Sequence, residues 1–176
     1  MVDALLKMDG EILLFIQDHI RQEWMDWFWK AVTHLGDGGV FWILLGIILL
    51  FSKKTRPAGV AALLALLVGA LITNVCLKNF VARIRPYEVV EGLRLMIERQ
   101  RDYSFPSGHT LSSAACATVL TLENRKFAYG AIPMAVLIAF SRLYLYVHFP
   151  TDVIGGALIG IAIGYTAFKF AKKQII

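Results

Sequence analysis

Charged residues are scarce in this sequence, and over long stretches they are absent. Asp, Glu, Lys and Arg make up 18% of the 176 residues, while hydrophobic residues make up 57%, more than a soluble domain of this size usually contains. Residues 57–77, 104–122 and 127–141 contain none of the four charged types, and residues 35–52 and 149–168 each contain a single aspartate. This shortage of charge favours a membrane protein over a soluble one.

The apolar runs also lack the alternation of polar and apolar residues that lipid-facing β-strands show. Continuous apolar runs are typical of helices, the other structure that crosses a bilayer. Each of the five stretches, alone or with a short extension, supplies roughly the 20 residues that cross about 30 Å of hydrocarbon. We therefore predict an all-α fold, a polytopic transmembrane helical bundle of five to six spans, with residues 35–176 as the transmembrane domain.

Cysteine is rarer still, with two residues in the chain. Cys76 and Cys116 both fall within apolar stretches, so we expect ordinary buried packing for them, and they indicate no redox compartment.

Glycine has a more regular pattern, because Gly156, Gly160 and Gly164 put a small residue at every fourth position of the last apolar stretch. Such spacing suits close helix contact, either within the bundle or between two copies of it.

Residues 1–34 lack a clean membrane span. Leu5, Met8, Ile12 and Phe15 recur at helical spacing, but acidic residues interrupt the apolar surface and three tryptophans follow closely. Tryptophan prefers the interface between membrane and water. The pattern predicts an interfacial segment of one or two amphipathic helices, and a poorly formed sixth span is the alternative.

Lysine and arginine gather in three junctions, at residues 53–56, 123–126 and 169–173. With five spans these junctions fall on one face, which the positive-inside rule makes cytoplasmic. We therefore expect a multi-pass protein of the cell membrane, with the remaining polar clusters at its extracytoplasmic face.

Three clusters at that face contain ionisable side chains, each of which costs at least ~2.5 kcal/mol at membrane depth. Cations around histidines make an anion site, and the fork of an arginine matches phosphate oxygens. Because the same cations would repel a divalent ion, we expect no metal. Acidic residues in the loop at 86–105 are expected to form a solvated surface, with one of them able to pair with an arginine. The clusters contribute Lys78, Arg85 and Arg142, with Arg83 as a possible fourth cation, and the histidines His109 and His148.

Two helix N-termini are predicted at the same face. In FPSGHT, Ser107 is a natural N-cap, so Gly108 and His109 would open a helix with free backbone N–H groups that suit an anion. In VHFPTD, Pro150 suits the first helical turn, which places His148 just before the helix and Asp152 within its first turn.

The two histidines differ in whether a carboxylate lies near them in the sequence. Asp152, four residues after His148, can orient the imidazole of His148 and leave its second nitrogen free to attack. His109 has no carboxylate in its own motif, so it is better placed as the proton donor to a leaving group.

Together these residues resemble the three-part signature of the type 2 phosphatidic acid phosphatase superfamily. Its parts are Lys78 followed after six residues by Arg85-Pro86, then Pro106-Ser107-Gly108-His109, then Ser141-Arg142 followed after five residues by His148 and after three more by Asp152. The resemblance implies a metal-independent phosphatase with a helical bundle core and no cofactor. It implies that His148 forms a phosphohistidine, that Asp152 orients it and that His109 protonates the leaving oxygen. The residues expected to hold the phosphoryl oxygens are Lys78, Arg85, Ser107, Gly108 and Arg142.

Membrane members of this superfamily act on lipid phosphates and diphosphates, so the resemblance implies a lipid phosphate substrate within the bilayer and no nucleic-acid partner. We slightly favour undecaprenyl diphosphate, because a compact chain with an outward-facing site and a short loop suits recycling of a cell-wall carrier. Phosphatidylglycerophosphate, phosphatidate and lipid A are the other candidates. Two alternatives stay open: a non-enzymatic carrier of lipid phosphates or organic anions, and a phosphotransferase that uses the same site. The sequence predicts no particular oligomeric state.

Overall fold

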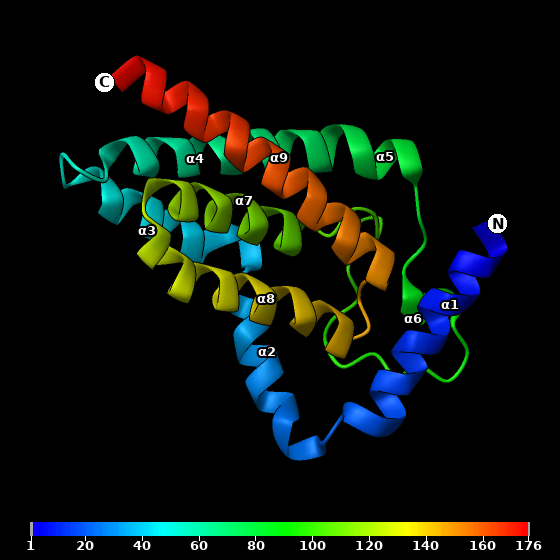
Figure 1. Ribbon diagram of the computed structural model, residues 1–176. Helices are drawn as coiled ribbons and strands as arrows, with labels where there is room; N and C mark the ends of the chain where they lie inside the picture. The colour runs from blue at the N-terminus through cyan, green and yellow to red at the C-terminus, as the bar shows by residue number, and fades with distance from the viewer. Residues whose placement is uncertain (1, 176) are drawn as a thin grey trace.

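The computed structural model describes residues 2–175 as helices and their connections, with no strand in that range (Figure 1). The predicted all-α fold is thus confirmed. The helices are α1 (Val2–Phe15), α2 (Asp26–Leu35), α3 (Val40–Leu50), α4 (Arg56–Leu71), α5 (Lys78–Val81), α6 (Pro86–Val89), α7 (Gly108–Glu123), α8 (Ala128–Tyr144) and α9 (Pro150–Ile175).

Helix α7 lies at the centre of the bundle and packs against α4, α8 and α9. Its contact with α9 is the most extensive, because the small residues expected in the last apolar stretch face it. A Cβ atom on Gly156 would lie 2.7 Å from the carbonyl oxygen of Ser107, and one on Gly160 would lie 3.0 Å from the Cβ of Ala114. The glycine stripe therefore serves packing within the bundle.

Fewer helices than expected are long and apolar enough to cross a membrane. Among residues 2–175, three stretches qualify, Arg56–Val89, Arg125–Tyr144 and Pro150–Gln174, and the pair Glu23–Leu35 and Asp37–Leu50, bent by 46°, raises the number to four. Helix α7 has 16 residues, so it is about 24 Å long and shorter than the hydrocarbon layer. A membrane-spanning helical bundle is supported, and a count of five to six spans stays a prediction.

The first expected span, residues 35–52, is broken near its start. Gly38 and Gly39 have φ of 58° and 72°, the left-handed region that glycine enters without steric cost. The chain bends there through the short 3₁₀ turn η3 (Asp37–Gly39), and α2 packs beside α8. The bend brings Asp37 to the end of the bundle where α7 begins.

Before this bend, α1 contacts α9 and lies to one side of the helices at the centre of the bundle (Figure 1). Trp24 and Trp27 are exposed, as are Leu5 and Phe15 on α1. Exposed apolar and tryptophan side chains suit an interface, and the division into an interfacial segment 1–34 and a membrane domain 35–176 stays a prediction.

The two ends of the bundle differ in composition. The α3–α4 and α7–α8 connections and the C-terminal end of α9 carry the basic junctions and lie together at one end, while α5 and the first turns of α7 and α9 lie toward the other (Figure 1). Cys116 is buried as expected, but the expectation was wrong for Cys76, which is exposed on the outer surface of η4 (Ile72–Leu77).

Candidate functional site

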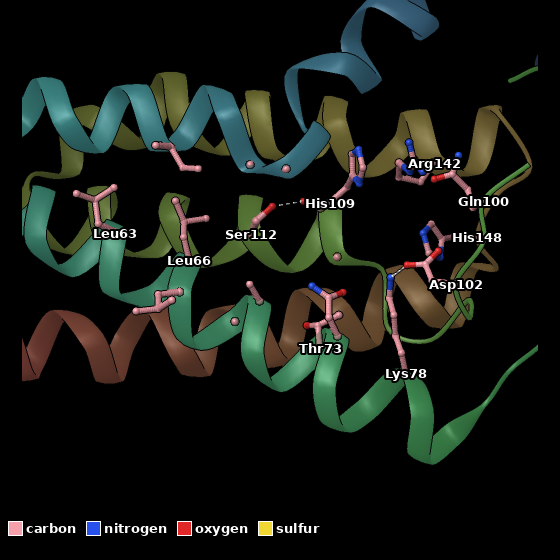
Figure 2. Close-up of a pocket in the computed structure, with 18 of the residues that line it drawn as sticks. Leu63, Leu66, Thr73, Lys78, Gln100, Asp102, His109, Ser112, Arg142 and His148 are labelled. Atoms are coloured by element: carbon pink, nitrogen blue, oxygen red, sulfur yellow. Dashed lines mark hydrogen bonds and ion pairs between the residues drawn. The ribbon is translucent and has the colours of Figure 1, made fainter. Parts of the chain in front are cut away.

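A cavity of about 540 Å³ opens where α3, α4, α5 and α7 meet the loops before α7 and α9. Its two ends differ: Leu63 and Leu66 lie at one end, and Lys78 and His148 lie at the other (Figure 2). Six of the eight predicted site residues line it, namely Lys78, Arg85, Gly108, His109, Arg142 and His148. The remaining two, Ser107 and Asp152, are buried directly behind, joined by a backbone hydrogen bond of 3.2 Å from the Ser107 nitrogen.

His148 is held between a carboxylate and a cation. Its Nδ1 lies 3.6 Å from Asp152 Oδ2, with no closer hydrogen-bond partner among residues 2–175, and its Nε2 lies 3.4 Å from Arg85 Nη1. Burial lowers the pKa of His148 to about 3; Asp152 opposes this shift, and the charges of Arg85 and Arg142 add to it. The imidazole is therefore neutral at pH 7, the form in which a ring nitrogen has a lone pair for attack.

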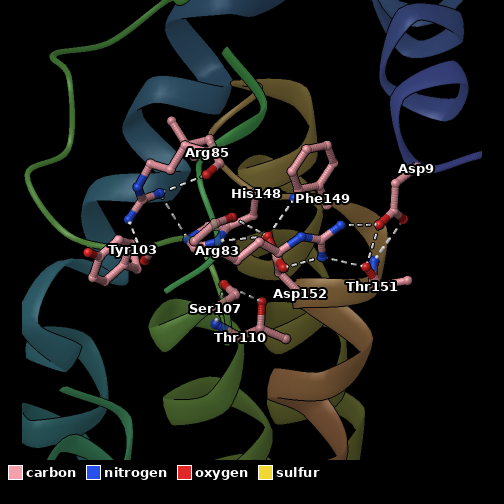
Figure 3. Close-up of polar contacts among 12 residues, drawn as sticks. Asp9, Arg83, Arg85, Tyr103, Ser107, Thr110, His148, Phe149, Thr151 and Asp152 are labelled. Atoms are coloured by element: carbon pink, nitrogen blue, oxygen red, sulfur yellow. Dashed lines mark hydrogen bonds and ion pairs between the residues drawn. The ribbon is translucent and has the colours of Figure 1, made fainter. Parts of the chain in front are cut away.

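Asp152 is fully buried, and both of its carboxylate oxygens accept hydrogen bonds. It accepts hydrogen bonds from the Ser104 hydroxyl, from the Phe149 backbone nitrogen at 2.8 Å and from Arg83 Nη1 at 2.6 Å (Figure 3). Arg83 also donates to Asp9 Oδ2 at 2.7 Å. Arg83, expected as a possible fourth phosphate cation, instead ties two buried carboxylates together behind the cavity.

Asp9 is a residue that the sequence reasoning missed. Its carboxylate has no exposed surface, and it accepts hydrogen bonds from the backbone nitrogen of Thr151 at 3.1 Å, from the Thr151 hydroxyl and from Arg83 (Figure 3). The available signal was an aspartate amid the apolar residues of α1, which the sequence alone allowed on either face. Its position links α1 to the first turn of α9.

Asp102 is the acidic residue of the loop at 86–105 that pairs with an arginine, as the sequence allowed for one of them, and its side chain is about half exposed. Arg85 Nη2 donates to its Oδ1 at 2.6 Å, and Lys78 Nζ donates to its Oδ2. Partial burial favours a raised pKa for Asp102, but the hydrogen bond and charge of Lys78, with those of Arg85, hold it at about 2. In this structure a carboxylate thus lies between two of the cations expected to bind phosphate.

Arg142 and the start of α7 offer unused donors. Arg142 is 2% exposed and donates to Thr33, while its Nε has no partner among the described residues. Ser107 Oγ accepts from the Thr110 nitrogen at 3.4 Å, which confirms the predicted N-cap. Gly108 and His109 therefore begin the helix, where backbone N–H groups lack a carbonyl one turn earlier.

His109 has the carboxylate partner that its own motif lacks. Its Nε2 lies 2.9 Å from Asp37 Oδ1, and Asp37 Oδ2 lies 2.7 Å from His34 Nδ1. The sequence reasoning missed this contact, because 72 residues separate the two. A signal was present, since Asp37 is the single charged residue of the stretch 35–52.

Metal ligands are not gathered in the part of the chain that the structure describes. No group of three or more His, Cys, Asp or Glu side chains within residues 2–175 is arranged to hold a metal ion. Metal independence stays a prediction that rests on the chemistry of the donors, which are mostly cations.

Two relatives with known names align with most of this chain. An undecaprenyl-diphosphatase of Sulfolobus acidocaldarius is 36% identical over 130 residues, which cover 73% of this chain and 62% of that protein. Phosphatidylglycerophosphatase B of Bacillus subtilis is 32% identical over 170 residues, which cover 88% of this chain and 79% of the relative. This chain therefore spans about three fifths of the length of the first of these relatives.

Solved structures extend the likeness to the fold. The crystal structure of a PAP2-type phosphatidylglycerolphosphate phosphatase from Bacillus subtilis superposes with a TM-score of 0.78 and 30% identity, over 97% of this chain and 87% of that one. The sequence profile of the PAP2 superfamily matches residues 58–176, a range that includes both cavity histidines and all the cavity cations named above. The resemblance seen in the sequence is thereby confirmed, and the chain belongs to the PAP2 superfamily.

Proposed function

We propose that this protein is an integral membrane phosphatase that removes phosphate from a lipid phosphate or diphosphate through a phosphohistidine intermediate. One observation carries the proposal: two histidines and three cations, Lys78, Arg85 and Arg142, line one cavity that continues into an apolar end. The polar end suits a phosphate head, and the leucines of the other end suit hydrocarbon. The named relatives, which are membrane phosphatases of lipid phosphates, support the same reading.

The proposed reaction begins at His148. The neutral Nε2 attacks phosphorus, the bond from phosphorus to the lipid oxygen breaks, and that oxygen takes a proton from His109. Lys78, Arg85, Arg142 and the N–H groups at the start of α7 stabilise the charge on the phosphoryl oxygens. Water then attacks phosphorus, His109 takes the proton of the water, and the bond between phosphorus and nitrogen breaks to regenerate His148.

Asp152 is proposed to orient the nucleophile rather than to act on substrate. Its four-residue separation from His148 and the 3.6 Å between Oδ2 and Nδ1 support this role. Ser107 would help by capping α7, so that Gly108 presents its backbone to the phosphoryl oxygens.

Undecaprenyl diphosphate and phosphatidylglycerophosphate are the substrates that we place first. The 36% identity to an undecaprenyl-diphosphatase supports the first, and the fold similarity to a phosphatidylglycerolphosphate phosphatase over 97% of this chain supports the second. We propose the cell membrane as location, with the site on the extracytoplasmic face, because the basic junctions gather at the opposite end of the bundle (Figure 1).

Phosphate release by the purified protein in detergent tests the proposal. The wild type is expected to release inorganic phosphate from undecaprenyl diphosphate, phosphatidylglycerophosphate or phosphatidate, with no loss in EDTA. His148→Ala should lower the rate at least about 10³-fold, because removal of a nucleophile removes the whole covalent route. His19→Ala is the matched control, since His19 is exposed on η1 (Ile16–Ile20).

Three outcomes would count against the proposal. A substantial residual rate in His148→Ala would reject the nucleophile. Transport of a lipid phosphate into vesicles without phosphate release would favour a carrier, and transfer of phosphate to an added alcohol in preference to water would favour a phosphotransferase.

A further inference from the structure

Asp37 lies on a turn whose shape is fixed by glycine. The segment Gly36-Asp37-Gly38-Gly39 joins α2 to α3, and the positive φ of Gly38 and Gly39 sets the bend. A Cβ atom on Gly36 would lie 2.5 Å from His109 Cδ2 and 2.9 Å from Ile138 Cγ2. The turn therefore passes against the His109 ring at a distance that a larger residue would prevent.

Because the turn passes so close, the Asp37 carboxylate contacts the His109 ring. The distance of 2.9 Å between Asp37 Oδ1 and His109 Nε2 is that of a charge-assisted hydrogen bond. With Nε2 engaged, Nδ1 is the nitrogen left for a leaving group in the cavity. The second oxygen of Asp37 is held by His34, so the carboxylate is fixed from both sides.

The charges around His109 explain why such a partner is needed. Arg142 of α8 and Lys78 of α5 line the same cavity and disfavour a positive imidazole, and Asp37 of η3 is the carboxylate in contact with it among the described residues. His34 of α2 reaches the pair only through Asp37. A proton donor placed among cations needs a compensating negative charge to keep its proton.

We propose that Asp37 is a positioning residue for His109, orienting the ring and favouring its protonated form for proton transfer to the leaving oxygen. This inference rests on the proposed phosphatase function. In the first step the phosphorus–oxygen bond breaks, its electron pair goes to the leaving oxygen, and His109 supplies the proton. Asp37 stays charged throughout, and His109 recovers its proton from the water of the second step. The arrangement parallels that of Asp152 and His148 on the other side of the cavity.

The dependence of rate on the leaving group separates this role from a merely structural one. Asp37→Asn is expected to lower kcat about 10²-fold on dioctanoyl phosphatidate, whose alkoxide leaving group needs a proton. On 4-nitrophenyl phosphate, whose phenolate leaves unaided, the loss should stay below about 10-fold. Asp37→Glu should restore part of the lost rate, and Asp18→Asn, an exposed aspartate on η1, is the matched control for charge.

A second readout does not depend on turnover. Histidine ¹⁵N NMR of the detergent-solubilised protein, with His109→Gln to assign the signal, follows the charge on the ring. In Asp37→Asn the titration midpoint of His109 should fall by about one pH unit or more, and the alkaline limb of the pH–rate profile should move the same way.

The two readouts tell the possible failures apart. An equal loss on both substrates, or an unchanged midpoint in an active protein, would overturn the role of Asp37 and leave the phosphatase standing. A wild type that releases no phosphate from any substrate would overturn the proposed function and with it the catalytic role of the pair. If Asp37→Asn also left the titration midpoint of His109 unchanged in that inactive protein, the proposed charge coupling between Asp37 and His109 would be rejected as well.

Discussion

Replacing Asp102 by asparagine is expected to tighten the binding of phosphate. The Asp102 carboxylate bonds to Lys78 and Arg85, so an incoming phosphate must compete with it for the same two cations. Because the side chain is 49% exposed, its ion pairs have the strength of partly solvated ones, at most about 1 kcal/mol each. Asparagine keeps a neutral hydrogen bond, so we expect a net gain of about 1 kcal/mol, a five-fold lower inhibition constant.

Competitive inhibition by inorganic phosphate and by orthovanadate provides the assay. Acidification does not mimic the substitution above about pH 4, because the pKa of Asp102 lies at about 2 and the carboxylate keeps its charge. Glu91→Gln, an exposed position on the same loop, controls for the loss of one negative charge. An unchanged or higher inhibition constant in Asp102→Asn would refute the reasoning, since it would mean that the carboxylate orders the cations and does not compete for them.

Two further predictions concern stability. Gly160→Leu should lower the unfolding temperature in detergent, because overpacking against Ala114 of α7 costs about 1–3 kcal/mol. Gly130→Leu on α8 should leave the unfolding temperature unchanged, because a Cβ atom there meets nothing within 4 Å. Equal effects of the two substitutions would reject the tight contact between α7 and α9. Lowering the pH from 7 to 5 should destabilise the protein by about 2 kcal/mol through His148 alone. The unfolded chain protonates this ring below its ordinary pKa of 6.5, while the folded protein holds it neutral to about pH 3, so the unfolded state binds the extra proton. His148→Gln should flatten this dependence in thermal unfolding, and an equal pH dependence in the variant would contradict the assignment.

Local patterns were the part of the molecule that the sequence predicted well. The N-cap at Ser107, the helix start at Pro150 and the approach of Asp152 to His148 all depend on residues within four positions of one another. Over such distances helical geometry alone decides which side chains meet. The apolar runs are local patterns too, and they were sufficient to predict the all-α fold.

Long-range contacts were the part that could not be predicted. The partners Asp9 and Arg83 are 74 residues apart, and Asp37 and His109 are 72 apart. Whether they meet depends on how α1 docks and on how the turn of η3 bends, which no periodicity encodes. The span count stays a prediction for a related reason, since the glycine turn splits one apolar run and α7 ends after 16 residues.

The charges at this end of the bundle fall into a fixed half and an adaptable half. Arg83 holds the fully buried Asp9 and Asp152, and none of the three lines the cavity. The carboxylates beside the cavity, Asp37 and Asp102, are about half exposed, at 53% and 49%. Only this second pair can change its contacts without leaving a buried charge unpaired.

Under the proposed function, we expect phosphate binding to act on the adaptable half. Four cations (Lys78, Arg83, Arg85 and Arg142) face four carboxylates (Asp9, Asp37, Asp102 and Asp152) among the described residues of the site, so the group is neutral while both histidines are uncharged. A phosphate dianion would leave it with two negative charges in a poorly solvated place, which is costly. Release of Asp102 to solvent would remove one of these charges, and a proton on His109 would compensate the other. Under the proposed function we therefore expect binding of the dianion, departure of Asp102 and protonation of His109 to be coupled.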